Sequence, residues 1–206
     1  MTKLPTRNRD LTSAKIIEAV GRVLARDGID KIGINAIARE AGVDKVLIYR
    51  YFEGLPKLLT AWAASGEFWP SVQELVDISP PNLMELPLAE RYVFFFDHFI
   101  DSLRARPLTI EILAGEISHR NALTDIMEDQ REKWGEEVGR TLAALSEYQA
   151  HPALLPLTNV LIAGVQNLLI RARSIHSFGG LDIQSDEGWN LVKKSIGVMA
   201  NKLFKP

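Results

Sequence analysis

The chain has 206 residues, of which 47% are hydrophobic and 24% charged, and this composition is typical of a globular protein with a sizeable core. It holds no cysteine, which excludes disulfides and thiolate metal sites. The formal net charge of −2 argues against nonspecific nucleic-acid binding by the chain as a whole, and the first ten residues lack the apolar run of a secretory signal, so we expect a cytoplasmic protein.

The N-terminal residues, up to about Arg9, form a polar and basic arm. Its cations, Lys3, Arg7 and Arg9, either reach a DNA groove or backbone or belong to a solvated tail. A helix is predicted from about Thr12 to Asp27, because apolar side chains recur there at helical spacing. These side chains are Ile16, Val20, Val23 and Leu24.

Two short helices joined by a tight turn are predicted between Ile34 and Phe52. The first helix ends at Ala41, and Gly42 follows it at the position where a left-handed residue closes a turn at low cost. Asp44 is a good N-cap for the second helix, because its carboxylate accepts orphan amide hydrogens. This is the helix-turn-helix layout, in which the second helix enters the major groove of DNA. The alternative is an ordinary helical hairpin with a charged outer face.

The second of these helices, Lys45–Phe52, has two opposite faces on a wheel of about 100° per residue. One face is a core stripe, which consists of Leu47, Ile48, Tyr51 and Phe52. The other face consists of Lys45, Val46, Tyr49 and Arg50. Two cations and a phenol are groups that can meet phosphates and base edges, so this face is expected to bind DNA.

The segment resembles the DNA-binding domain of the TetR-type (tetracycline-repressor-like) transcriptional regulators. The resemblance rests on IAREAGV at 37–43, IYRYF at 48–52 and the pair of leucines at 58–59, and it covers about residues 12–60. It implies that Lys45, Tyr49 and Arg50 touch DNA, and that Tyr51 and Phe52 lock their helix onto the next one. The full set of expected DNA-binding residues is Asn35, Arg39, Lys45, Val46, Tyr49, Arg50, Tyr51 and Lys57.

The chain departs from the family pattern at three places. Asp44 stands where the family often has Ser or Thr, and Val46 stands where a small or hydroxyl residue is common. Leu55 replaces a lysine that commonly holds a phosphate at the start of the fourth helix, and Lys57, two residues later, is the candidate to replace it.

The remaining segments are predicted to be helices separated by clear breaks. Three prolines within Ser79–Pro87 mark the clearest loop. The expected helices run from Pro56 towards Val76, over 90–106, about 108–117, about 121–148, 152 to about 175, and 186 to about 204. No segment shows sustained period-2 alternation, so the predicted fold is all-α. An N-terminal three-helix helix-turn-helix domain, residues 1–55, precedes a larger helical ligand-binding and dimerisation domain, residues 56–206.

The charge distribution agrees with this division. Residues 1–60 hold 11 Lys and Arg against 7 Asp and Glu, whereas residues 61–206 hold 13 against 19. A basic head on an acidic body fits a DNA reader attached to a domain that does not touch DNA.

The last two helices are expected to be covered by protein. The stretch from Pro152 to Ile170 is nearly long enough to span a bilayer, but it carries Asn159, Gln166 and Asn167, whose amides are costly in lipid. A helix that is apolar nearly all round must be covered on every side. We therefore expect a homodimer through about 152–175 and 186–204, which the resemblance also implies, with an intramolecular bundle as the alternative. The residues expected in or beside this interface are Leu168, Leu169, Val192 and Ile196.

No catalytic constellation stands out, so we do not expect an enzyme. The four histidines, His98, His119, His151 and His176, lie scattered without metal-ligand spacing, and no metal or other cofactor is expected.

A pocket for a small apolar effector is expected between the C-terminal helices, because polar groups within apolar helices need partners that a ligand can supply. Its expected walls are Phe95, His98, Glu116, Trp134 and Asn167. The alternative is that these side chains belong to an ordinary core. The predicted function is that of a transcriptional regulator, a ligand-responsive homodimeric repressor that binds a near-palindromic operator. An all-α enzyme and a helical protein–protein adaptor are the alternatives, and neither would bind DNA with a steep salt dependence or a sequence preference.

Overall fold

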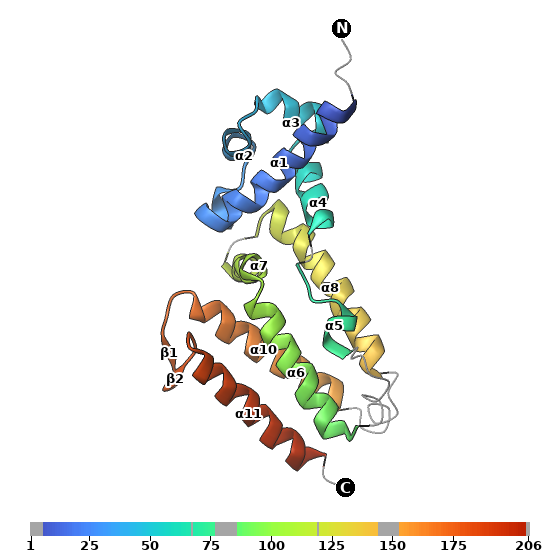
Figure 1. The fold of residues 1–206 in the computed structure, drawn as a ribbon, viewed down its shortest axis with the longest axis vertical. Helices are drawn as coiled ribbons and strands as arrows, with labels where there is room; N and C mark the ends of the chain where they lie inside the picture. The colour runs from blue at the N-terminus through green and yellow to red at the C-terminus, as the bar shows by residue number, and fades with distance from the viewer. Residues whose placement is uncertain (1–5, 67, 77–85, 119, 144–152, 205–206) are drawn as a thin grey trace. The chain divides into compact units, whose positions relative to one another are not determined.

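The computed structural model describes residues 6–66, 68–76, 86–118, 120–143 and 153–204, which are almost entirely helical (Figure 1). Its helices are α1 (Thr6–Asp27), a short 3-10 helix η1 (Ile29–Lys31), α2 (Ile34–Ala41), α3 (Lys45–Phe52), α4 (Leu55–Ser65), α5 (Val72–Val76), α6 (Leu88–Arg104), α7 (Pro107–Ser118), α8 (Ala122–Ala143), α10 (Leu154–Ala172) and α11 (Asp186–Leu203). Two very short strands, β1 (Ser177–Phe178) and β2 (Leu181–Asp182), pair antiparallel with Ser177 opposite Asp182. The predicted all-α fold is confirmed.

The chain forms two compact units. The first unit combines the residues up to Phe68 with Pro107–Arg131, and the second combines Trp69–Arg106 with the residues from Glu132 onwards. Helix α8 contributes its first half to one unit and its second half to the other. The predicted functional boundary after residue 55 stays a prediction.

The first unit is built around α1, whose apolar stripe is fully buried as predicted. This helix packs against α2, α4 and α7. Helix α7 lies so close to η1 that a Cβ atom added at Gly115 would be 2.5 Å from Cδ1 of Ile29. The hydroxyl of Thr109, at the start of α7, donates a hydrogen bond to the carbonyl of Phe68. The core of the N-terminal segment therefore includes a helix from much later in the chain.

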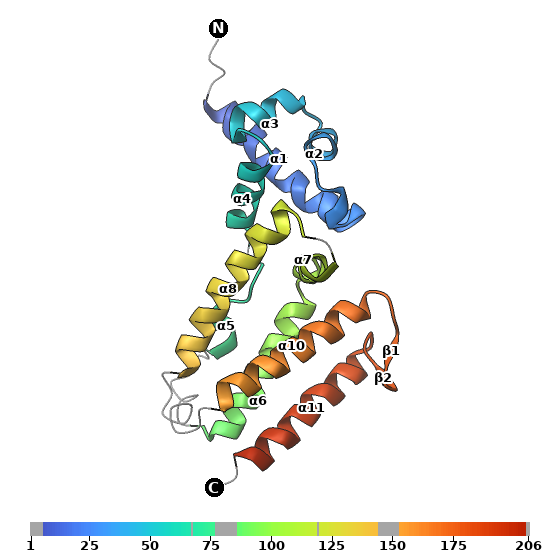
Figure 2. The same ribbon diagram turned by 180° about the vertical axis from the view of Figure 1, so that it is seen from behind.

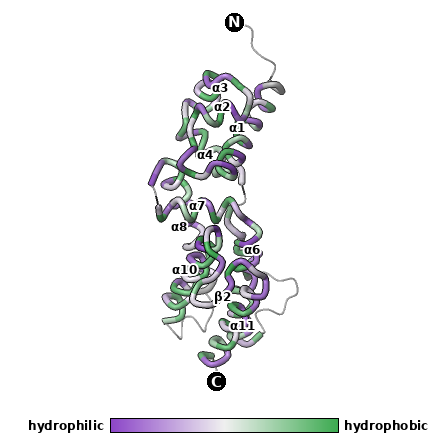
Figure 3. The backbone as a smooth tube through the Cα atoms, turned by 90° about the vertical axis from the view of Figure 1, so that its left-hand side faces the viewer, coloured by the Kyte–Doolittle hydropathy of each residue, from purple (hydrophilic) through white to green (hydrophobic). Residues whose placement is uncertain are grey.

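The second unit is built around α6, which packs against α5 and α11. The side chains of Phe96, Phe99, Ile100 and Leu103 are fully buried. Helix α10 is tied to α6 by the hydroxyls of Tyr92 and Thr158, which lie 3.2 Å apart. The small hairpin joins α10 to α11 (Figure 2). Hydrophobic and hydrophilic residues are interspersed along the helices (Figure 3).

Several predicted boundaries are wrong. Helix α1 begins at Thr6 rather than Thr12, so the last residues of the expected arm are helical, while Lys3 lies outside the described residues. Helix α4 ends at Ser65 instead of continuing towards Val76, because Gly66 has an extended backbone (φ −115°, ψ 148°) and Pro70 cannot continue a helix.

Two further expectations fall wholly or partly outside the described part of the chain. Most of the proline-rich loop, residues 79–85, is outside it, and so is the predicted extension of the long helix beyond Ala143.

Within the described ranges, α10 alone is long and apolar enough to cross a membrane by length and composition. Its mean hydropathy is 1.4. This is weak support for a membrane span, because core helices of soluble proteins meet the same criteria.

Candidate nucleic-acid interface

The turn between α2 and α3 has the predicted geometry. Gly42 adopts the left-handed conformation (φ 63°, ψ 42°), and the N–H groups of Gly42 and Val43 donate to carbonyls in the last turn of α2. The carboxylate of Asp44 accepts a hydrogen bond of 2.8 Å from the N–H of Val46, which is the predicted N-cap of α3. The backbone groups of both helix ends at this turn are thus partly satisfied within the turn itself.

Helix α3 has the two predicted faces. Ile48 and Phe52 are buried, whereas Lys45, Val46, Tyr49 and Arg50 are exposed. The exposed fractions of Val46 (60%) and Tyr49 (52%) are high for such large apolar side chains. Lys45 and Arg50 form no ion pair with any other described residue, so their charges are available to an external anion.

Tyr51 lies between two cations. Its half-buried ring has the guanidinium carbon of Arg9 at 5.4 Å and that of Arg50 at 5.3 Å from the ring centroid. Each of these cation–π contacts stabilises an exposed guanidinium by about 0.5–1 kcal/mol. The ring therefore holds a cation of α1 next to α3. The side chains of Lys3 and Arg7 lie outside the described residues.

The predicted contacts from α2 and α4 are also on the surface. Asn35 and Arg39 are exposed on α2. Lys57 is 65% exposed in the first turn of α4 and forms an ion pair with Glu53, four residues earlier. A phosphate contact by Lys57 would compete with that surface pair, which costs little to break.

Glu40 links α2 to α1, a contact that the sequence did not predict. Its two carboxylate oxygens accept hydrogen bonds from Arg26 (2.5 Å) and Arg22 (2.8 Å). These two bonds, first that from Arg26, hold the pKa of Glu40 below its usual range. A pair of arginines four residues apart, which share one face of α1, was the only sequence signal for this contact.

Two of the five predicted effector residues come together in the second unit. Phe95 is buried and its ring stacks on Phe99 at 6.0 Å, while Phe99 stacks on Trp134 at 6.2 Å. Trp69 also stacks on Trp134, with the ring centroids 5.8 Å apart. The indole N–H of Trp134 donates to the carbonyl of Pro70 at 2.6 Å. This hydrogen bond from Trp134 to the backbone therefore helps to hold the aromatic array in place.

The other three predicted effector residues lie elsewhere. His98 is exposed on α6, where its ring stacks on Phe94 at 3.6 Å and its Nδ1 lies 3.0 Å from the Phe94 carbonyl, so in the described structure it faces solvent rather than a cavity. Asn167 is exposed on α10. Glu116 belongs to the first unit and accepts a hydrogen bond from Arg131 at 3.0 Å. The effector contacts of the five residues stay predictions.

Helices α10 and α11 leave large apolar side chains exposed. Val160 is 68% exposed, Leu191 55% and Val198 51%. Of the four residues expected in or beside a subunit interface, Leu168 and Val192 are half-buried, whereas Leu169 and Ile196 are buried within the chain itself. Only 22% of the apolar 18-residue stretch of α10 is buried.

No group of three or more His, Asp or Glu side chains in the described parts of the chain could hold a metal ion.

The family model described as bacterial regulatory proteins, tetR family, matches residues 16–61, the segment that carries the helix-turn-helix just described. Residues 16–61 therefore belong to the tetR family of bacterial regulatory proteins. The resemblance read from the sequence is confirmed. In this TetR-family domain, α3 is the helix that follows the turn, and one of its faces is exposed.

Solved structures resemble the fold of the chain over nearly its whole length. A TetR-like transcriptional regulator from Rhodococcus sp. RHA1 is 16% identical, with a TM-score of 0.60 and 98% of each chain covered. The multidrug binding protein EbrR, in complex with imidazole, is 19% identical, with a TM-score of 0.61 and 99% of this chain and 95% of that chain covered.

A third similar structure is NalD, the secondary repressor of the MexAB-OprM multidrug efflux pump in Pseudomonas aeruginosa. It is 16% identical, with a TM-score of 0.59 and 95% of this chain and 96% of that chain covered. At these identities the likeness is one of fold. A search of curated protein sequences gives no significant match.

Proposed function

We propose that the chain is a ligand-responsive, homodimeric transcriptional repressor that acts in the cytoplasm on a near-palindromic DNA operator. The observation that carries the proposal is the exposed face of α3, with Lys45, Tyr49 and Arg50 on a TetR-family helix-turn-helix. In such a dimer each α3 enters the major groove of one half-site, and the half-sites lie about 34–36 Å apart or a multiple of that distance.

The test is a titration of the purified protein with DNA from immediately upstream of its own gene, at several salt concentrations. A phosphate contact by Lys45 predicts that Lys45→Ala weakens binding to all sequences alike and lowers the salt slope by about one. Loss of a bidentate base contact by Arg50 would cost about 1–3 kcal/mol at one position of the operator.

A matched control replaces exposed cations that lie far along the chain from α3. Lys133→Ala and Arg140→Ala remove the same charges from the exposed surface of α8 and should leave operator affinity unchanged. If alanine at Lys45, Tyr49 and Arg50 together changed affinity by less than about twofold in a folded protein, the assignment of α3 to DNA would be wrong.

The exposed apolar residues of α10 and α11 support a second copy as the dimer partner. Burial of apolar surface contributes about 25 cal/mol per Å². Val160 is the most exposed of these side chains, so Val160→Glu should yield monomers and abolish operator binding, whereas Val160→Ile should preserve both. A monodisperse wild-type monomer in sedimentation at micromolar concentration would overturn the dimer.

An effector in the second unit is supported by the aromatic array around Trp134 and by the similarity to EbrR, which binds imidazole. A ligand that stabilises one separation of the two α3 helices in the dimer would weaken binding to an operator whose half-sites match a different separation. A multidrug-type aromatic ligand should then quench Trp134 and reduce operator affinity. Quenching that persists in Trp134→Phe would place the ligand elsewhere.

A further inference from the structure

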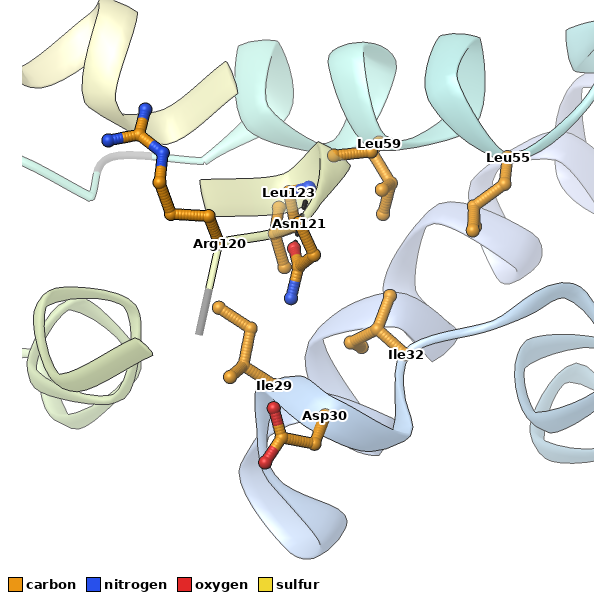
Figure 4. Close-up of a pocket in the computed structure, with 9 residues that line it drawn as sticks. Ile29, Asp30, Ile32, Leu55, Leu59, Arg120, Asn121 and Leu123 are labelled. Carbon is orange, nitrogen blue, oxygen red and sulfur yellow. Dashed lines mark hydrogen bonds between the residues drawn. The ribbon is translucent and has the colours of Figure 1, made fainter. Parts of the chain in front are cut away.

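A pocket that is open to solvent on one side is formed by residues of the first unit (Figure 4). Its volume is about 240 Å³. One wall is η1, the second is the start of α4, and the third is the start of α8. Five of its nine lining residues are large aliphatic ones: Ile29, Ile32, Leu55, Leu59 and Leu123.

The pocket contains one uncharged polar group, the side chain of Asn121. Its carbonyl oxygen caps α8, since it accepts hydrogen bonds from the N–H groups of Leu123 (2.9 Å) and Thr124 (3.1 Å). This use of the oxygen fixes the orientation of the amide, and the amide nitrogen points into the space above Ile29 (Figure 4). An N–H donor in an apolar site is stabilised when an acceptor reaches it.

The charged groups near the pocket disfavour an anion. Figure 4 shows the carboxylate of Asp30 and the guanidinium of Arg120 pointing away from the aliphatic lining. The guanidinium is neutralised by hydrogen bonds to Asp125 and Glu128. The three carboxylates of Asp30, Asp125 and Glu128 outnumber the single guanidinium of Arg120. An anionic ligand would therefore be repelled.

The walls are held in place by packing. Ile29 is 8% exposed and rests on Gly115 of α7, and Leu59 is 1% exposed. A pocket whose walls are fixed keeps its shape without a ligand, which lowers the entropic cost of binding.

We infer that this pocket binds a small uncharged molecule with an apolar ring and one hydrogen-bond acceptor, which pairs with the amide N–H of Asn121. A cavity of about 150 Å³ lined by aliphatic and aromatic side chains binds benzene. The larger volume here accommodates a ring together with a carbonyl substituent. The site is separate from the effector site proposed above and does not depend on DNA binding, so either can fail without the other.

Acetophenone is the probe, because it is an uncharged ring with a single carbonyl acceptor. Benzoate is its matched control, with nearly the same shape and a negative charge. Calorimetric titration of the full chain should show saturable binding of one acetophenone per chain, and at least about tenfold weaker binding of benzoate. The amide NMR signals of Leu123 and Asn121 should shift on addition of acetophenone.

Two variants locate the site. Asn121→Asp keeps the helix cap, because Asn and Asp are equally good N-caps, but removes the N–H donor, so it should weaken acetophenone binding by about tenfold without lowering Tm. Ala122→Phe adds a ring at an exposed position of the lining and should abolish binding. The inference is overturned if acetophenone shows no saturable binding to the wild type, or if acetophenone and benzoate bind equally well. It is also overturned if a folded Asn121→Asp or Ala122→Phe variant binds acetophenone with unchanged affinity.

Discussion

Gly115→Ala tests how tightly α7 packs on the DNA-binding segment. Gly115 lies in the interior of α7, and a Cβ atom there would be 2.5 Å from Cδ1 of Ile29 and 2.9 Å from its Cγ2. The terminal methyl group can rotate away, but Cγ2 is bonded directly to Cβ of Ile29, which would itself lie 3.4 Å away. The new methyl group therefore forces η1 or α7 to move.

The magnitude follows from two opposing contributions. Alanine stabilises a helix interior by about 1 kcal/mol relative to glycine. Overpacking a well-filled core costs about 1–3 kcal/mol. Because Ile29 cannot clear the contact by rotation of its terminal methyl group alone, we expect the second contribution to be larger. The net loss in free energy of unfolding should be up to about 2 kcal/mol.

The matched control is Gly135→Ala in α8, where a Cβ atom would have no described neighbour within 4 Å. The same substitution there should stabilise the protein by about 0.5–1 kcal/mol. Urea unfolding, followed by circular dichroism at one protein concentration, measures both changes through the midpoint at constant m. If both variants were stabilised alike, the close packing of α7 on Ile29 would be refuted.

Three further predictions concern caps and carboxylates. Asp44→Ala should destabilise the protein by about 1 kcal/mol in urea unfolding, whereas Asp44→Asn keeps the α3 cap and should cost little; equal losses would refute the cap. Glu40→Gln should destabilise the protein at neutral pH, and the difference in free energy of unfolding from the wild type should vanish in acid. The bonds from Arg26 and Arg22 lower the pKa of Glu40 in the folded protein. The stability that the Glu40 carboxylate contributes is therefore present above the ordinary Glu pKa and is lost as the pH falls through the lowered pKa of the folded state. A gap that persists when the carboxyl is protonated would mean that the ion pairs are not its cause. Asp97→Asn should stabilise the protein at neutral pH, because burial raises the pKa of Asp97 and ionisation of this carboxyl is unfavourable in the folded state. In thermal unfolding that advantage should disappear below the ordinary Asp pKa, where the wild-type carboxyl is protonated in both states, and an advantage that grows with acidity would contradict the assignment.

The local geometry of the helix-turn-helix could be predicted from the sequence. Gly42, Asp44 and the two faces of α3 depend on residues within one or two helical turns of each other, and such signals are contained in spacing and residue type. The cap of α11 is equally local, since the Ser185 hydroxyl accepts a hydrogen bond from the N–H of Gly188, three residues later.

Features that depend on distant parts of the chain could not be predicted in this way. The bonds of Glu40 to α1 require knowledge of how two helices cross, and periodicity alone placed this residue on the outer face. The exposure of His98 on α6 also depends on how helices pack, and the sequence predicted this residue in a pocket wall instead. The pocket beside Asn121 brings together residues separated by about 90 positions, and no local pattern encodes it.

The discontinuity of the first unit has a consequence for the order in which the protein matures during synthesis. Ile29 rests on Gly115, and Phe68 accepts a hydrogen bond from Thr109, so the DNA-binding segment lacks part of its core until α7 has been translated. At about 5–20 residues per second, the ribosome needs about 4–14 s to extend the chain from residue 62 to residue 131. Helix α6, the centre of the second unit, is made within that interval. The first unit is therefore completed only after α6 of the second unit has been made, and until then part of the apolar surface of the nascent DNA-binding segment stays uncovered.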